Sequence, residues 1–153
     1  MKRRILSLAA PLAVTGIAFI SLAQPAHAEA GQSFDLTLSM TSHGPIVDAG
    51  AAGSSPGDTS YVSGVVRSAG TKVGRFGGTC TQLTATNQQC TFTLGLADGQ
   101  LAIMAGYGPG MNVGGNTALE PIVGGTGKYE GARGQSTSIE HSRTITMHIH
   151  LLP

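Results

Sequence analysis

The residues best suited to chemistry in this chain stand in a glycine-rich stretch, IVGGTGKYEGARGQ, which runs from Ile122 to Gln135. Five glycines separate a lysine, a tyrosine, a glutamate and an arginine, and a phosphate-binding loop is the first interpretation to test. A Walker loop requires a glycine where this chain has Ile122, and a Ser or Thr where it has Tyr129. A dinucleotide-binding turn requires a third glycine where Glu130 stands. The spacing therefore excludes both phosphate motifs.

Three histidines, His141, His148 and His150, are the candidates for a metal site. His148 and His150 are two residues apart, so a strand places them on one face, a spacing that can chelate a metal ion. A polar strand face explains the same pattern without a metal, and we favour that interpretation. We predict neither a metal site nor another cofactor.

The first 28 residues have the features of a secretory signal. Lys2, Arg3 and Arg4 precede an apolar run from Ile5 to Leu22, and the segment ends in a small-x-small cleavage site at Ala28. A membrane anchor is the alternative, because the run is near the lower limit for crossing a bilayer. We predict cleavage after Ala28, a single domain over residues 29–153, a secreted protein and no integral membrane segment after cleavage.

Charge and cysteine content narrow the function further. The signal takes three of the nine Lys and Arg residues, which leaves six against eight acidic residues and a net charge of about −2. No basic run remains, so the sequence excludes nucleic-acid binding as a partner class. Cys80 and Cys90 form the only possible intramolecular pair, and in an exported chain they predict a disulfide. Without a free thiolate or a G-x-S-x-G elbow, nucleophilic catalysis has no support.

The sequence predicts that β-strands position these residues. Apolar side chains alternate with polar ones, most clearly at Ile145, Met147, Ile149 and Leu151, and no window shows a capped helical period. About eight short strands predict an antiparallel sandwich or barrel, and closure into a barrel removes exposed edges. The disulfide then joins two strands of one hairpin. The expected strands cover residues 34–41, 59–67, 72–83, 90–97, 100–107, 117–123, 135–142 and 144–152.

The thirteen residues from Ile122 to Gly134 resemble a signature of the dirigent and allene oxide cyclase-like barrel superfamily, V-x-G-G-T-G-K-F-x-x-A-R-G. The resemblance implies an all-β fold, an eight-stranded antiparallel β-barrel with an apolar cavity, often assembled as a homotrimer. Plant members steer the coupling of phenoxy radicals or cyclise reactive intermediates, and bacterial relatives include cyclases that shape polyketides. We expect residues 124–127 to form a tight connection into the next strand, with Lys128 and Glu130 in solvent.

The resemblance also suggests which residues act on a ligand. Arg133 matches the arginine of the signature, although an ion pair at a barrel end is an equally good interpretation. Glu120 stands just before the signature, where plant members often have an acidic residue. Tyr107 ends an apolar strand face and is placed to present its hydroxyl at the barrel mouth; the alternative is a hydroxyl bonded to backbone. These three are the catalytic candidates, and the predicted cavity residues are Leu38, Phe92, Ile103 and Met147.

One departure from the family pattern bears on the chemistry. Many plant dirigent proteins carry a His-Asp pair at the end of the first strand, where this chain reads Met40-Thr41-Ser42-His43-Gly44-Pro45 without an acid. Asp48 or Asp58 would have to substitute for that aspartate. The departure argues against radical coupling of the plant type.

Two functions remain open. The first is a dirigent-like or cyclase-like barrel that binds a small apolar metabolite and directs its cyclisation or coupling, which requires a cavity with a few polar groups. The alternative is a non-catalytic secreted barrel with a binding or structural role. The mature chain has six aromatic residues and no Trp, which slightly favours the alternative or an aliphatic ligand. The sequence predicts neither the substrate nor whether there is turnover.

Overall fold

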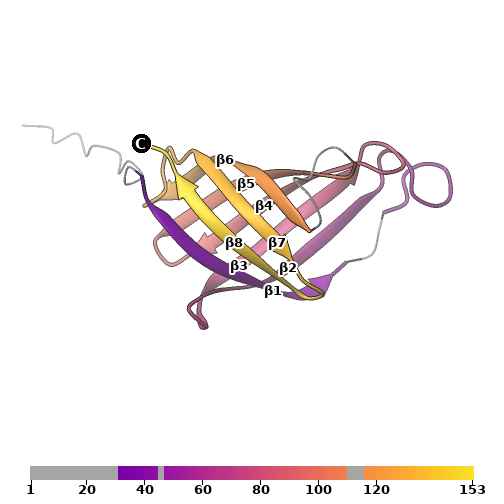
Figure 1. The fold of residues 1–153 in the computed structure, drawn as a ribbon. Coiled ribbons are helices and arrows are strands. Elements are labelled where there is room, and N and C mark those ends of the chain that lie inside the picture. Colours follow the sequence, from indigo (N-terminus) through magenta and orange to yellow (C-terminus); the bar gives the residue numbers. More distant parts are fainter. Residues whose placement is uncertain (1–30, 45–46, 110–115) are drawn as a thin grey trace, which may run out of the picture.

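A computed structural model describes residues 31–44, 47–109 and 116–153, and these form eight antiparallel strands (Figure 1). The predicted signal lies outside the described residues. The strands are β1 (Ser33–His43), β2 (Thr59–Ser68), β3 (Thr71–Gln82), β4 (Gln88–Leu96), β5 (Gly99–Tyr107), β6 (Thr117–Gly127), β7 (Gly134–Glu140) and β8 (Thr144–Leu151).

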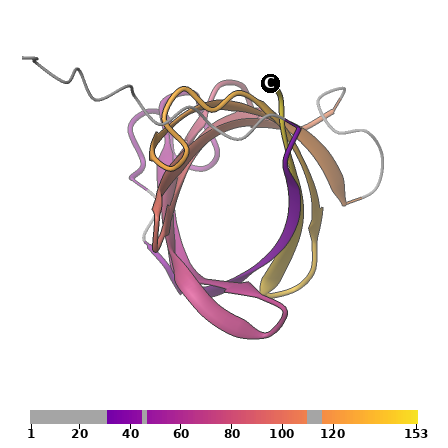
Figure 2. The ribbon, with the colours of Figure 1, turned by 90° about the vertical axis from the view of Figure 1, so that its left-hand side faces the viewer.

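The sheet closes on itself as a barrel. Each strand pairs with the next along the chain, and β8 pairs with β1, where Leu36 stands opposite Met147. Figure 2 shows the resulting ring of strands. The eight-stranded antiparallel barrel expected from the sequence is therefore confirmed. Within the described ranges, the chain forms no helix with the length and hydropathy needed to cross a bilayer.

Strand alternation builds the core. Successive side chains of a strand point to opposite faces, so every second residue enters the barrel. In β8 the inward residues are Ile145, Met147, Ile149 and Leu151, and each is at most 9% exposed. The other strands follow the same alternation except where the register shifts in the β1–β2, β2–β3 and β5–β6 pairs. The inward apolar residues form one core cluster that includes Leu36, Leu38, Val66, Phe76, Phe92, Leu94, Leu101, Ile103 and Ile122.

The glycine-rich stretch is placed differently from our expectation. Residues 124–127 do not form a tight connection; they extend β6 and pair with the start of β5. The turn falls on residues 128–133 instead. It folds back so closely that a side chain at Gly125 would collide with the carbonyl oxygen of Tyr129. Tyr129 is 8% exposed and its ring centroid lies 6.3 Å from that of Phe34, so the tyrosine packs into this end of the barrel.

The disulfide joins the β3–β4 hairpin, as predicted. Cys80 and Cys90 stand directly opposite each other, with their Cα atoms 4.0 Å apart. Both cysteines are buried on the inner face of the barrel.

Residues 47–58 form a connection at the other end of the barrel, away from the C-terminus (Figure 1). Asp58 is 7% exposed and holds this connection together. Its carboxylate accepts hydrogen bonds from the backbone amides of Ala49 at 3.0 Å and Ser55 at 2.8 Å, and from the Ser55 hydroxyl at 3.2 Å. These bonds hold the pKa of Asp58 below its usual value.

Candidate functional site

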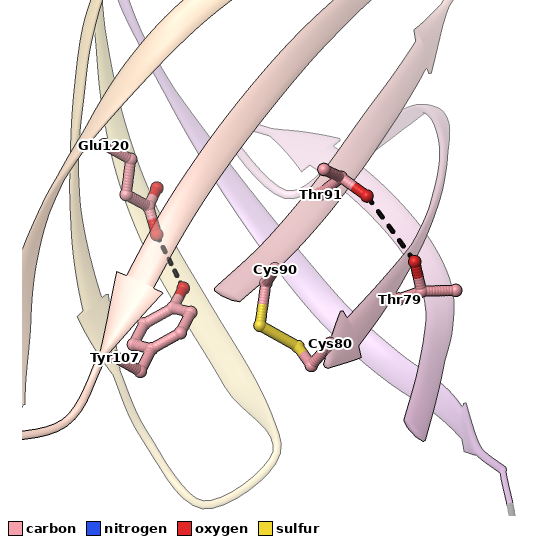
Figure 3. The surroundings of a disulfide bond; sticks show 6 residues. All are labelled: Thr79, Cys80, Cys90, Thr91, Tyr107 and Glu120. Carbon is pink, nitrogen blue, oxygen red and sulfur yellow. Dashed lines mark hydrogen bonds between the residues drawn. A yellow bond between two sulfur atoms is a disulfide. The ribbon is translucent and has the colours of Figure 1, made fainter. Parts of the chain in front are cut away.

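A buried carboxylate with three hydroxyl donors lies inside the barrel. The Tyr107 hydroxyl donates to Oε1 of Glu120 at 2.6 Å, as Figure 3 shows. Ser138 donates to the same oxygen at 2.9 Å, and Ser136 donates to Oε2 at 2.6 Å. Glu120 is 1% exposed, and both serines are fully buried. Hydroxyl donors on both oxygens are the partners that an ionised carboxylate requires in an apolar interior.

Strand register brings these groups together. Tyr107 is the last residue of β5, Glu120 lies in β6, and Ser136 pairs with Glu120 across the β6–β7 ladder. Ser138 follows Ser136 by two residues and therefore points to the same inner face. The cluster is thus built from three adjacent strands and needs no loop to position it.

A pocket opens beside this cluster at the end of the barrel opposite Tyr129. Its volume is about 380 Å³, within the range of small-molecule sites. Apolar side chains form part of its wall, and polar groups converge on it from several strands. We call it the mouth pocket. Its lining residues are Met40, His43, Ser60, Val62, Cys80, Gln88, Phe92, Tyr107, Glu140, His141 and Ile145.

Tyr107 separates the mouth pocket from the deeper interior. Behind it lies an inner void of about 10 Å³, which has room for one water molecule at most. Tyr107, Phe92 and Ile145 line both spaces, and Glu120 lines the inner void. A ligand in the mouth pocket therefore meets Tyr107 first and reaches Glu120 through it.

The electrostatics of the site raise the pKa values of two groups. Burial, followed by the charge of Glu120 and the hydrogen bond to it, raises the pKa of Tyr107 well above its usual value. Burial and the charge of Glu120 also raise the pKa of Glu140. Tyr107 is consequently a neutral phenol that donates to Glu120 under ordinary conditions.

A bulge in β1 turns His43 toward the mouth pocket. The β1–β2 register shifts between Met40 and Ser42, so Thr41 is the extra residue. After the shift His43 stands opposite Val62, whose side chain faces the interior. Without the bulge, strict alternation would place His43 on the outer face.

The barrel fold of this chain is similar to the folds of several solved structures. A structure of pyocyanin demethylase has a TM-score of 0.67 and 22% sequence identity, and the match covers 78% of this chain and 99% of the other. A pterocarpan synthase dirigent protein, PsPTS1, has a TM-score of 0.62 and 17% identity, covering 82% of this chain and 97% of the other. An exo-specific intermolecular Diels-Alderase, AbnU, has a TM-score of 0.57 and 12% identity, covering 80% and 98%.

The chain has the dirigent-type barrel fold. At these identities the match establishes the fold alone, and it confirms the fold expected from the signature. No protein-family model matches the sequence, and no curated protein matches it.

In this dirigent-type barrel the three catalytic candidates do not lie together. Tyr107 and Glu120 share a hydrogen bond, whereas Arg133 precedes β7 at the end of the barrel closed by Tyr129. Arg133 is exposed, and its guanidinium donates to the carbonyl oxygen of Pro153 at 3.4 Å. Arg133 does not line the mouth pocket, and its catalytic role stays a prediction.

The four predicted cavity residues all face the interior but at different depths. Phe92 lines the mouth pocket and the inner void, while Leu38 and Met147 line the inner void alone. Ile103 is 1% exposed and packs in the core cluster. Among the four, Phe92 is the one placed to touch a ligand in the mouth pocket.

The three C-terminal histidines have different contacts and share no common partner among the described residues. Nδ1 of His148 lies 2.6 Å from Oδ1 of Asp35, and Nδ1 of His150 lies 2.9 Å from the Ser33 hydroxyl oxygen. Both pairs are exposed on the outside of the barrel, while His141 lines the mouth pocket. Within the part of the chain that the structure describes, no three His, Cys, Asp or Glu side chains are grouped to hold a metal ion.

The sequence analysis missed Ser136, Ser138, Glu140 and His43 as site residues. The three β7 residues could have been found from the sequence. They stand at every second position, and each pairs with a β8 residue whose apolar alternation already predicted an inward side chain. Ser138, for example, stands opposite Met147. His43 carried no such signal, since its orientation depends on the bulge at Thr41.

Neither Asp48 nor Asp58 replaces the aspartate that the family pattern has at the end of β1. Asp58 uses both oxygens to hold the 47–58 connection, and Asp48 lines an adjoining pocket rather than the mouth pocket. The adjoining pocket shares Ser60, Cys80 and Gln88 with the mouth pocket.

Proposed function

We propose that this protein is a secreted barrel that binds a small, mainly apolar metabolite in its mouth pocket and directs the metabolite's cyclisation or coupling. The observation that carries the proposal is the Tyr107–Glu120 hydrogen bond of 2.6 Å at the inner wall of a pocket of about 380 Å³. A few converging polar groups in an apolar concavity are typical of sites that orient a small molecule.

The geometry supports a proton relay. A ligand hydroxyl that donates to the Tyr107 oxygen completes a chain from ligand to phenol to carboxylate. The ligand proton can pass to the Tyr107 oxygen while the Tyr107 proton passes to Oε1 of Glu120, which leaves an oxyanion on the ligand. Ser136 and Ser138 keep Glu120 in place during this exchange. Apolar walls hold the activated ligand in one orientation, which favours one product over others.

The similar structures support a role on small molecules. Their names describe a demethylase, a pterocarpan synthase and a Diels-Alderase, each of which converts an organic compound. The common feature is the barrel, and the reactions differ. We therefore take from them a role on small molecules and none of the individual substrates.

The alternative is a barrel that binds without turnover. The observation in its favour is the packed interior, where Leu94, Leu101, Ile149 and Leu151 are buried, so that the space for a ligand is in the mouth pocket or in a hollow of about 290 Å³ beside Tyr129 at the opposite end. Under this alternative the Tyr107–Glu120 pair orients the ligand and no product forms.

Export and assembly complete the proposal. We propose cleavage after Ala28, which the disulfide supports because such bonds persist in oxidising compartments. We also propose a homotrimer, which rests on the resemblance and on exposed apolar side chains over the outer faces of β5, β6 and β7, namely Met104, Leu119, Val123 and Ile139. N-terminal sequencing of exported protein and light scattering test these two points.

Native mass spectrometry tests the function. The oxidised protein is incubated with an extract of its source culture, and the bound compound is identified and then incubated with catalytic amounts of protein. We expect one small molecule per chain and a new product. Ser60→Trp, which fills the mouth pocket, should prevent binding. A bound compound that is returned unchanged supports the alternative, and equal binding by Ser60→Trp contradicts both functions.

A further inference from the structure

We infer that Glu140 selects ligands by charge, so that the mouth pocket prefers a positively charged aromatic or apolar molecule over a neutral or anionic one of the same shape. The inference rests on the proposed function and adds the charge class of the ligand. It begins with the orientation of β7. Ser136 and Ser138 are buried in the barrel, and Glu140 follows at the same parity opposite Ile145, where the end of the strand leaves it exposed at the mouth. Glu140 lines the mouth pocket.

The carboxylate of Glu140 has no partner among the described residues. Its backbone amide donates to the Asn116 carbonyl at 3.0 Å, and its own carbonyl accepts from the Asn116 side chain at 3.3 Å. Both bonds involve the backbone of Glu140, so they fix the end of the strand without engaging the carboxylate. Glu120, by contrast, is saturated by three hydroxyls. Burial and the neighbouring charge of Glu120 raise the pKa of Glu140, and a cation in the pocket would offset both effects.

No fixed positive charge balances these acids within the pocket. None of the described Lys or Arg residues lines the mouth pocket or the inner void. Arg143 lines a hollow on the rim that shares Met40 and His43 with the mouth pocket, and His43 and His141 are the titratable bases of the mouth pocket itself. The adjoining pocket adds Asp48 and Asp58. Within the mouth pocket an anionic ligand therefore meets like charge, whereas a cation finds the carboxylate of Glu140.

Three probes on one ring system test the inference. 10-Methylacridinium is a cation, acridine is neutral in mildly alkaline buffer, and acridine-9-carboxylate is an anion. Their affinities for the oxidised protein are measured by fluorescence titration at low and at high salt. Glu140→Gln removes the charge and keeps the shape of the side chain. Glu130→Gln is the matched control, because Glu130 is an exposed carboxylate in the turn at the other end of the barrel.

We expect 10-methylacridinium to bind at least about fivefold more tightly than acridine, and acridine more tightly than the carboxylate. The cation preference should disappear in Glu140→Gln, persist in Glu130→Gln and weaken as salt screens the charges. Equal affinities of the three probes for the unmodified protein would overturn the inference, as would a preference that survives in Glu140→Gln.

The same titrations separate this inference from the proposed function. If acridine binds and Ser60→Trp abolishes its binding, the mouth pocket or the adjoining pocket that shares Ser60 with it is a ligand site, whatever the order of affinities of the three probes. If none of the probes binds, or if Ser60→Trp binds all three as the unmodified protein does, the pocket is not the site, and the proposed function and the charge inference both fail.

Discussion

The hydroxyl of Tyr107 lies 2.6 Å from Oε1 of Glu120, and this hydrogen bond links the wall of the mouth pocket to a carboxylate that is 1% exposed. The two residues come from the adjacent strands β5 and β6. A molecule that contacts Tyr107 is consequently one hydrogen bond away from a buried acid. The Tyr107–Glu120 hydrogen bond thus gives the barrel interior a polar group that a purely apolar core would lack.

Glu120→Ala should destabilise the protein by about 3 kcal/mol, because it leaves the hydroxyls of Tyr107, Ser136 and Ser138 without an acceptor in the interior. Chemical denaturation of the oxidised protein measures the change in unfolding free energy. Glu130→Ala, at an exposed position, should change it by no more than about 0.5 kcal/mol. Equal effects of the two substitutions would show that the buried network does not stabilise the fold.

Tyr107 should resist ionisation in alkali, because burial and Glu120 raise its pKa; burial and Asp98 also raise the pKa of Tyr129. Absorbance of tyrosinate, measured as pH rises past about 10, should therefore be lower in the folded than in the unfolded protein. Tyr107→Phe should reduce the signal of the unfolded protein by about one third, since the chain has three tyrosines, and leave that of the folded protein unchanged.

The same shift predicts the direction of the stability change. A pKa that is raised in the folded state contributes stability that is present below the unfolded value, about 10 for tyrosine, and is lost as pH rises through the folded value. The unfolding free energy should fall above about pH 10, and it should fall less in Tyr107→Phe. A Tyr107→Phe protein with an unchanged alkaline slope would contradict the burial of this phenol.

Asp58→Asn should loosen the 47–58 connection, because the amides of Ala49 and Ser55 lose a charged acceptor. Hydrogen exchange of these two amides should become faster at neutral pH. In the unmodified protein the lowered pKa of Asp58 means that its stabilisation is present above the unfolded value of about 3.9 and is lost as pH falls below it.

Asp48→Asn is the matched control, since the Asp48 side chain forms no hydrogen bond with any residue that the structure describes. Exchange at Ser55 should not change in this variant. If Asp58→Asn left both amides as protected as before, the proposed role of Asp58 in holding the connection would be wrong.

Arg133→Ala decides which end of the barrel receives the ligand. Because Arg133 is exposed at the end closed by Tyr129, the substitution should leave acridine affinity within about twofold. Ser60→Trp, which fills the mouth pocket, should weaken the affinity by at least about tenfold. The reverse result would restore Arg133 as a binding residue and move the site to the opposite end. Thermal melts establish that both variants are folded.

Much of the fold was predictable because strand alternation is a local signal. The inward set of β8, from Ile145 to Leu151, was read directly from the sequence and is buried. The hairpin disulfide was expected from two cysteines in a chain with a predicted export signal, and the structure contains it. Residues 124–127 were misplaced because glycine is typical of turns, and nothing in the sequence shows that this run pairs with β5. Close contact with Tyr129 explains Gly125 after the fact, and a positive φ of 62° explains Gly127.

The site was harder to predict than the fold. Tyr107 and Glu120 were chosen separately, and only the register of β5, β6 and β7 brings them together. Ser136 and Ser138 are ordinary strand residues until Glu120 is placed opposite Ser136. His43 depends on a one-residue bulge, which has no reliable sequence signal. Arg133 was chosen from a motif, and the structure places it away from Tyr107 and Glu120.

The most direct test of the central claim is the position of a bound ligand in a crystal structure of the oxidised protein grown with acridine. The account predicts the acridine in the mouth pocket, against Phe92 and Ile145. Acridine bound beside Tyr129 and Arg133, or only on the outer face of the barrel, would contradict it.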